Sequence, residues 1–255
     1  MSTITSYASR SDDETLNYGG PHHWQIQPWA RFIRRHLRQR EYFRWVEQYC
    51  TSVKVRGQDR LANLDGPVII IANHQSHMDT PVLMSAMPKD VQDNLYFGAA
   101  ADRWFVKGKR KLILQPWYQS LGMGNFPIVR GGGSKTLDYA RWLLDQKCNI
   151  CIFPEGTRAT DSKLGKFRHG VTLLAREHDI PVVPVVLQGL QDLRPKGART
   201  VTPGPVSVSI LEPVNLRACD SVEAATELLW QKMNAVFFKA IPFTAPDNEV
   251  VTRAA

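Results

Sequence analysis

The sequence predicts an α/β fold: a mixed, largely parallel central sheet of about seven strands with helices on both faces, preceded by an N-terminal Arg-rich amphipathic helix. Two observations predict this fold. Short β-branched runs alternate with helical patterns along the chain, which is typical of α/β sheets. The runs at 67–73 and 181–189 are also continuously apolar, as expected of central strands covered on both faces. The 255 residues are enough to bury a core without disulfides or metals.

The individual elements follow from these patterns. Strands are expected at 52–57, 67–73, 95–101, 126–130, 149–156, 181–189 and 206–214. Helices are expected at about 78–87, 134–146, 167–178 and 222–240, where apolar residues recur at helical spacing. No run approaches the roughly 18 apolar residues of a membrane-spanning helix.

A single domain is expected over residues 23–240, with no internal repeat or linker. Residues 1–22 are polar and lack periodicity, so we expect a disordered leader there. Residues 241–255 are expected to form a loose tail.

The segment 23–50 contains the amphipathic helix. Apolar residues recur near helical spacing from about 28 to 50, and arginines fill the remaining positions; the apolar set is Trp29, Phe32, Ile33, Leu37, Phe43, Val46 and Cys50. Either this apolar stripe packs on the core, or the helix lies in a membrane interface. Residues 31–60 carry nine basic and three acidic side chains, most of the net charge of +8. Clustered positive charge indicates an anionic partner, either nucleic acid or anionic lipid.

The four cysteines are too few and too scattered for a disulfide scaffold, and no secretory signal precedes them. Reduced thiols in the cytosol are therefore expected. Cys148 and Cys151 have the spacing of a redox or zinc motif. They lie within a strand pattern, however, and no second pair accompanies them, so two buried thiols are the favoured interpretation.

The segment 73–79 follows a central strand, at the edge where α/β sheets bind ligands. The turn can bring the carboxylate of Asp79 back to His74, which would fix the imidazole and make its other nitrogen a base. Ser76 and Asp79 also form a capping box, with Ser76 as the N-cap, and this role is compatible with the first. His74 and His77 as metal ligands are disfavoured because no second ligand cluster has a matching spacing.

Two further segments carry polar residues at strand ends. Arg130 ends a strand and precedes three glycines, which suits a phosphate but is also consistent with a plain turn. In the run 153–158, Thr157 and Arg158 can bind phosphate oxygens, and Gly156 permits close backbone approach. Glu155 can pair with Arg158 or Arg130, or hydrogen-bond a substrate hydroxyl.

As a set, these residues resemble the glycerolipid acyltransferase family. Four blocks match in order and spacing: NHQSHMD (73–79), GNFPIVR (124–130), FPEGTR (153–158) and IPVVPV (180–185). The resemblance implies transfer of a fatty acyl group from acyl-CoA or acyl carrier protein to the hydroxyl of 1-acylglycerol-3-phosphate, giving phosphatidic acid. It also implies that His74 is the base, that Asp79 orients it, and that Arg130 with Glu155, Gly156, Thr157 and Arg158 binds the acceptor.

The resemblance leaves other acceptors open, namely glycerol-3-phosphate or another lysophospholipid. It implies no metal and no cofactor besides the acyl donor. The expected partner is a membrane surface with anionic lipid, contacted peripherally from the cytoplasmic side and in a salt-sensitive way by the basic segment. A non-enzymatic nucleic-acid-binding protein is the alternative from another class, but it has no need for the residues at the strand ends.

Overall fold

The computed structural model describes residues 20–62, 64–106, 111–129, 136–158, 163–193, 200–238 and 249–250. Within these ranges the chain forms an eight-stranded sheet of order β4-β3-β5-β2-β6-β7-β1-β8. The strands are β1 (Cys50–Arg56), β2 (Ile69–Ala72), β3 (Leu95–Ala100), β4 (Asn125–Ile128), β5 (Asn149–Ile152), β6 (Val182–Gln188), β7 (Gly204–Ile210) and β8 (Glu249–Val250). All seven predicted strands are present. The eighth, a two-residue strand, comes from the segment expected to be a loose tail, and residues 1–19 of the expected leader lie outside the described ranges.

The sheet is largely parallel, as predicted. β2 pairs in parallel with β5 and β6, and β3 pairs in parallel with β4 and β5. β1 and β7 are also parallel to each other, whereas β6 with β7 and β1 with β8 are antiparallel. The carboxyl ends of β2, β3, β5 and β6 therefore share one edge, which brings together the segments that follow them.

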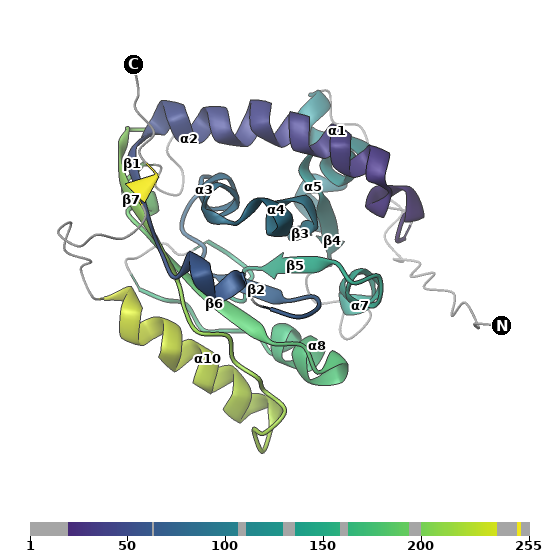
Figure 1. The fold of residues 1–255 in the computed structure, drawn as a ribbon, viewed down its shortest axis with the longest axis vertical. Coiled ribbons are helices and arrows are strands. Elements are labelled where there is room, and N and C mark those ends of the chain that lie inside the picture. The colour runs from purple at the N-terminus through teal and green to yellow at the C-terminus, as the bar shows by residue number, and fades with distance from the viewer. Residues whose placement is uncertain are drawn as a thin grey trace.

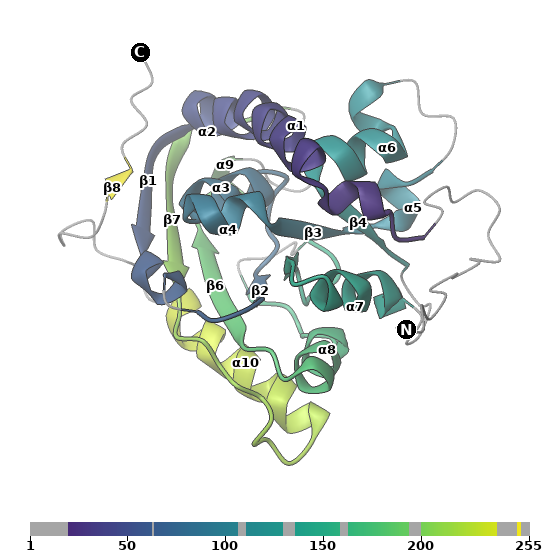
Figure 2. The same cartoon turned by 45° about the vertical axis from the view of Figure 1, so that its right-hand side comes forward.

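Helices cover both faces of the sheet (Figures 1 and 2). α7 (Asp138–Asp145), α8 (Gly170–His178) and α10 (Val222–Phe237) lie on one face. α3 (Asp79–Ala86) and α4 (Lys89–Asp93) lie on the other. The isoleucines of β2 alternate between the two cores: Ile70 packs in the cluster with Met84, and Ile69 and Ile71 pack in the cluster with Leu143. A fully covered central strand explains why its sequence is continuously apolar.

Short helical turns fill several connections. They are η1 (His23–Ile26), η3 (Gln58–Leu61), α5 (Ala101–Trp104), η4 (Leu112–Leu114), α6 (Pro116–Tyr118), η5 (Gln119–Met123) and α9 (Leu190–Leu193). Among the described residues, no helix is both long enough and apolar enough to cross a membrane.

The N-terminal helix has three parts: α1 (Pro28–Arg38), the π-helical turn η2 (Gln39–Phe43) and α2 (Arg44–Tyr49). It lies over α3 and α4, at the top of Figure 1. Its buried residues recur at every fourth position: Ala30, Arg34, Arg38, Tyr42, Val46 and Cys50. Positions four apart drift by about 40° around an α-helix. The wider π turn rotates the chain less per residue and keeps the series facing the domain.

The exposed face of α1 is apolar. Trp29, Phe32 and Ile33 are 51%, 60% and 37% exposed, whereas Arg34 and Arg38 are buried. The interpretation in which the apolar stripe packs on the core is therefore wrong for Trp29, Phe32 and Ile33, whereas Leu37 at the end of α1 does pack against the core. The same interpretation holds for Val46, which is buried in α2.

Arg34 is buried because it binds backbone carbonyls. Its Nε donates to the carbonyl of Leu121 at 3.0 Å, and its Nη2 donates to the carbonyl of Gln25 at 2.6 Å. The guanidinium also lies 4.6 Å from the ring centroid of Tyr96. Arg34 thus connects α1 to η1, η5 and β3.

Arg38 has the same role one turn further along. It donates to the carbonyls of Met123, Gln92 and Leu95. Its guanidinium passes so close to Gly124, which has a φ of +67°, that a Cβ there would collide with it. Burial lowers the pKa of Arg38 to about 9, so it is still charged at neutral pH.

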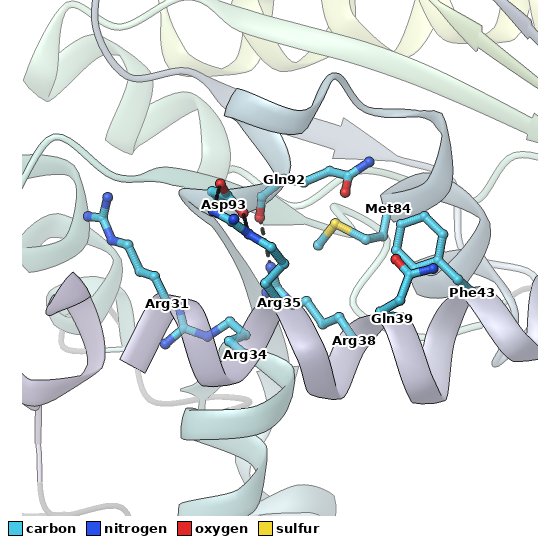
Figure 3. Close-up of a pocket in the computed structure, with 9 residues that line it drawn as sticks. All are labelled: Arg31, Arg34, Arg35, Arg38, Gln39, Phe43, Met84, Gln92 and Asp93. Atoms are coloured by element: carbon cyan, nitrogen blue, oxygen red, sulfur yellow. Dashed lines mark hydrogen bonds and ion pairs between the residues drawn. The ribbon is translucent and has the colours of Figure 1, made fainter. Parts of the chain in front are cut away.

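A small cavity of about 20 Å³ lies beside these arginines (Figure 3). It is bordered by α1, η2, α4 and the end of α3, through Arg31, Arg34, Arg35, Arg38, Gln39, Phe43, Met84, Gln92 and Asp93. Its volume accommodates about one water molecule. Asp93 forms a two-pronged ion pair with Arg35 at its mouth, so this feature belongs to the attachment of α1 to the domain.

Candidate active site

His74 and Asp79 lie together at the carboxyl end of β2. The Nδ1 atom of His74 is 2.7 Å from Oδ2 of Asp79, as predicted. Asp79 is completely buried, while the side chain of His74 is 25% exposed. Because a carboxylate only accepts hydrogen bonds, Nδ1 is the protonated nitrogen of this pair, and in the neutral imidazole Nε2 then carries the lone pair.

Asp79 also organises the backbone of the turn. Its carboxylate accepts from the amide of Gln75 at 2.7 Å and from the amide of Ser76 at 2.9 Å. The hydroxyl of Ser76 accepts from the amide of Met78 at 3.3 Å. The carboxylate half of the predicted capping box therefore forms, and Asp79 is the first residue of α3 instead of its third. The orienting and capping roles of Asp79 coexist.

Glu155 connects this turn to the end of β5. Its Oε1 accepts from the backbone amide of His74 at 2.8 Å, and its Oε2 accepts from the backbone amide of Gly165 at 3.0 Å. Glu155 is only 7% exposed, and this burial raises the pKa of its carboxyl group. The sequence left its partners open among arginines and a substrate hydroxyl. In the structure each of its oxygens accepts a hydrogen bond from a backbone N–H group.

Two neighbours of His74 restrict the turn further. The imidazole stacks on the ring of Phe153 with centroids 4.3 Å apart. The side chain of Asn73 pairs with the backbone of Leu187 in β6, donating to its carbonyl at 2.9 Å and accepting from its amide at 2.7 Å. His74 is thus held between the ends of β5 and β6, with one ring nitrogen left for a ligand.

The remaining residues of the FPEGTR run form a turn at the same sheet edge. Gly156 has a φ of +69°, a conformation that strongly favours glycine. Thr157 is exposed and Arg158 is half-buried. Arg130 lies outside the described residues, two positions beyond the end of β4. The structure therefore brings together His74, Asp79 and the 155–158 turn.

Residues 163–169 pack beside the 155–158 turn, and the sequence did not indicate this contact. The amide of Arg168 donates to the carbonyl of Pro154 at 2.9 Å. Its side chain passes over Gly156, where a Cβ would lie 2.7 Å from its Nε atom. These contacts join residues ten or more positions apart across a loop, and no local pattern announces them.

The other candidate groups lie elsewhere. His77 contacts Arg103 at 3.0 Å through its Nε2 and packs edge-on against Trp104, away from His74. Within the described ranges, no three His, Cys, Asp or Glu side chains are grouped as metal ligands would be. Cys148 and Cys151 are free, buried thiols, as expected, and burial raises the pKa of both.

This geometry suits general-base chemistry. A buried carboxylate fixes the tautomer of His74 and can stabilise the imidazolium that forms when Nε2 takes up a proton. The partly exposed side chain of His74 lies at the sheet edge where α/β proteins bind ligands.

Comparisons with known proteins agree with the residue pattern. A family model described as Acyltransferase matches residues 52–188. The 1-acyl-sn-glycerol-3-phosphate acyltransferase alpha of Mus musculus is 28% identical over 201 residues, covering 74% of this chain and 65% of the relative. The chloroplastic 1-acyl-sn-glycerol-3-phosphate acyltransferase LPAT1 of Arabidopsis thaliana is 28% identical over 168 residues, covering 64% of this chain and 44% of the relative. This chain thus spans less than two thirds of the length of either relative.

A solved structure is also similar. The crystal structure of the 1-acyl-sn-glycerophosphate (LPA) acyltransferase PlsC from Thermotoga maritima matches with a TM-score of 0.64 and 27% sequence identity. The match covers 82% of this chain and 78% of that chain. The likeness therefore extends beyond the motif blocks to most of the sheet and its helices.

Proposed function

Because this chain belongs to the acyltransferase family, we propose that it transfers a fatty acyl group from a thioester donor to the free hydroxyl of 1-acylglycerol-3-phosphate, giving phosphatidic acid. The observation that carries the proposal is the hydrogen bond from the partly exposed His74 to the fully buried Asp79. The names of the relatives support this acceptor. Glycerol-3-phosphate or another lysophospholipid is the alternative acceptor within the same chemistry.

The proposed reaction needs one base and no protein nucleophile. Nε2 of His74 takes the proton of the acceptor hydroxyl as its oxygen attacks the thioester carbonyl carbon. The tetrahedral intermediate then collapses, the carbon–sulfur bond breaks, and the imidazolium returns its proton to the leaving thiolate. Asp79 stabilises the imidazolium between these two steps. Holding both substrates in line supplies much of the rate, because a thioester is already activated.

For the acceptor phosphate, we propose Thr157 and Arg158 on the 155–158 turn, together with Arg130. The turn places a hydroxyl and a guanidinium next to Gly156, whose lack of a side chain permits close approach. Glu155 supports this site by joining the turn to the backbone of His74.

Substitution of His74 by alanine tests the proposed base. The backbone bonds of Glu155 and Asp79 do not involve the imidazole, so the variant should fold with a similar melting temperature. With purified protein and acyl-CoA, we expect the turnover of 1-acylglycerol-3-phosphate to fall at least about a hundredfold. Normal turnover by His74→Ala would exclude the mechanism, and equal activity on 1-acylglycerol, which lacks the phosphate, would exclude the acceptor site.

We further propose that the protein attaches to a membrane surface through the apolar face of α1. Trp29 and Phe32 are exposed there, and Trp117 is exposed on α6, which lies beside α1 in Figure 2. Leu112 on η4, shortly before α6 in the chain, is exposed too. Exposed apolar groups of this size mark an interaction surface, and aromatic residues favour the headgroup region. A lipid acceptor makes a lipid surface the fitting partner.

This surface differs from the basic one that the sequence predicts. Arg34 and Arg38 point into the domain and Arg35 pairs with Asp93, so three of the arginines are not directed at lipid phosphates. The exposed Arg40 and Arg44 on the same helix still favour anionic lipid, but as a supplement to apolar insertion. The same burial weakens the case for a nucleic-acid partner.

The donor and the compartment complete the proposal. Either acyl-CoA or acyl carrier protein supplies the same thioester chemistry, and no further cofactor is needed. The four free cysteines support a reducing, cytoplasmic side of the membrane. Activity assays of the purified protein with each donor decide between acyl-CoA and acyl carrier protein.

A further inference from the structure

We propose that Arg168 is a second phosphate-binding residue of the active site, next to Gly156. The proposal deepens the function proposed above and rests on it. The ligand is a phosphate group of a substrate, either the phosphomonoester of the acceptor or a phosphate of the coenzyme A donor. The contacts of Glu155 and Gly156 connect Arg168 to the turn that holds His74.

The segment that carries Arg168 is held firmly in place. The amide of Gly165 donates to Glu155, and the carbonyl of Gly165 accepts from the indole nitrogen of Trp230 at 3.1 Å. Leu164 and Phe167 are buried in the core. Arg168 itself is fixed through its backbone amide to Pro154. A side chain on such a segment starts from a defined position, which lowers the entropy lost when it binds a ligand.

Glu155 connects Arg168 to the proposed base through two short links. The carboxylate of Glu155 binds the backbone of His74 on one side and the backbone of Gly165, three residues before Arg168, on the other. The guanidinium of Arg168 then lies against Gly156, the residue after Glu155. A substrate can thus place its phosphate group at Gly156 while its hydroxyl group faces His74.

The guanidinium of Arg168 is free to bind such a ligand. Arg168 is exposed, and its side chain forms no hydrogen bond or ion pair with the residues that the structure describes. The carboxylate of Glu155 already accepts two backbone bonds. A planar guanidinium with unused donors recognises phosphate through paired hydrogen bonds.

Gly156 has two reasons to be glycine. Its φ of +69° is strained for any other residue, and a Cβ would approach Nε of Arg168 to 2.7 Å. The short distance means that a glycine at position 156 leaves room for the guanidinium of Arg168.

The test compares Arg168→Gln and Arg168→Lys with Arg217→Gln. Arg217 is also exposed and ion-paired to Asp179, but it lies beside the amino end of β6, at the opposite edge of the sheet, and controls for the loss of charge. KM and kcat are measured for short-chain 1-acylglycerol-3-phosphate with acyl-CoA, and again with an acyl pantetheine thioester, a donor that lacks the CoA phosphates.

We expect Arg168→Gln to raise one KM about ten- to a hundredfold with a much smaller change in kcat, the loss of one charge-assisted phosphate contact. Lysine should restore part of the affinity. A higher acceptor KM with both donors assigns Arg168 to the acceptor phosphate. A higher donor KM with acyl-CoA alone assigns it to coenzyme A.

Unchanged KM values in Arg168→Gln overturn the proposal, as does an equal change in Arg217→Gln. These outcomes presuppose an active wild-type enzyme. If the wild type transfers no acyl group to any phosphate-bearing acceptor, the proposed function itself fails. Equilibrium binding of inorganic phosphate by calorimetry gives a readout without turnover, and equal affinity of wild type and Arg168→Gln also counts against Arg168.

Discussion

Substitution of Phe32 by serine tests whether the outward face of α1 binds lipid. Phe32 is 60% exposed, and its neighbours on the sheet-facing side are arginines that bind carbonyls. The side chain therefore contributes little to the core. The free energy of unfolding in urea should stay within about 0.5 kcal/mol of the wild type.

The effect on membrane binding follows from the exposed area. A phenylalanine side chain offers roughly 200 Å², so an exposed fraction of 60% leaves about 120 Å² for contact with lipid. At about 25 cal/mol per Å², this area is worth about 3 kcal/mol. The partition coefficient of Phe32→Ser should therefore be about a hundredfold lower than that of the wild type.

The assay is co-sedimentation with vesicles of mixed zwitterionic and anionic lipid, at about 0.1 M and about 1 M salt. At the higher concentration the Debye length is only about 3 Å, so electrostatic attraction to the lipid is largely screened while attachment through apolar groups should persist. Phe238→Ser is the matched control: Phe238 is 62% exposed but follows α10, which lies on the opposite side of the sheet from α1 (Figures 1 and 2). Equal losses for both variants, or release of the wild type by salt, would refute the docking face.

Three further outcomes follow from contacts of the site and of α1. Asp79→Asn should lower kcat about 10²- to 10⁴-fold. Because Asp79 also accepts two backbone bonds, the same change should lower the free energy of unfolding by about 2–4 kcal/mol. In a His74→Ala background the effect on kcat should vanish, and an effect that persists would contradict the pairing of the two residues. Arg38→Met should cost about 3–5 kcal/mol in urea unfolding because its carbonyl partners lose their donor; Arg35→Met, at an exposed pair, should cost far less, and equal costs would contradict the clamp. Burial raises the pKa of Glu155, so ionising this carboxyl group lowers the free energy of unfolding of the wild type. This loss is absent at a pH below the ordinary pKa of glutamate and complete at a pH above the raised pKa of Glu155. Relative to the wild type, Glu155→Gln should therefore gain stability as the pH rises above the ordinary pKa of glutamate, about 4.3, and a flat difference in urea midpoints would contradict this.

The sequence predicted the sheet well because strand signals are local. The apolar runs around Ile70 and Val185 can only be central strands, and the alternation with helices fixes the class of fold. The contact of His74 with Asp79 was also predictable, since a five-residue turn after a strand brings the two side chains together. Both the strands and the contact of His74 with Asp79 depend on residues close together in the sequence, which is why they could be predicted.

The orientation of α1 was not predictable in this way. Helical periodicity defines two faces but does not say which one is inward, and the usual assumption places Phe32 inside. Arg34 and Arg38 reverse that assumption because they meet carbonyls of η5 and β3 that lie some 57 to 87 positions away. The bond of Glu155 to the amide of His74 spans 81 positions and has no local signal either.

The π turn of η2 has a consequence for how the helix tolerates changes in length. A π turn holds one residue more than the α-helical turn it replaces, while the flanking helices keep their relative orientation. Deleting one residue within Gln39–Phe43 would convert the four-residue step between Arg38 and Tyr42 into a three-residue step of an ordinary α-helix. Phe32 would still face outward, whereas the same deletion within α1 would rotate the residues before it by about 100°. The turn is therefore the position in this helix where the chain can shorten by one residue without changing which side faces the solvent.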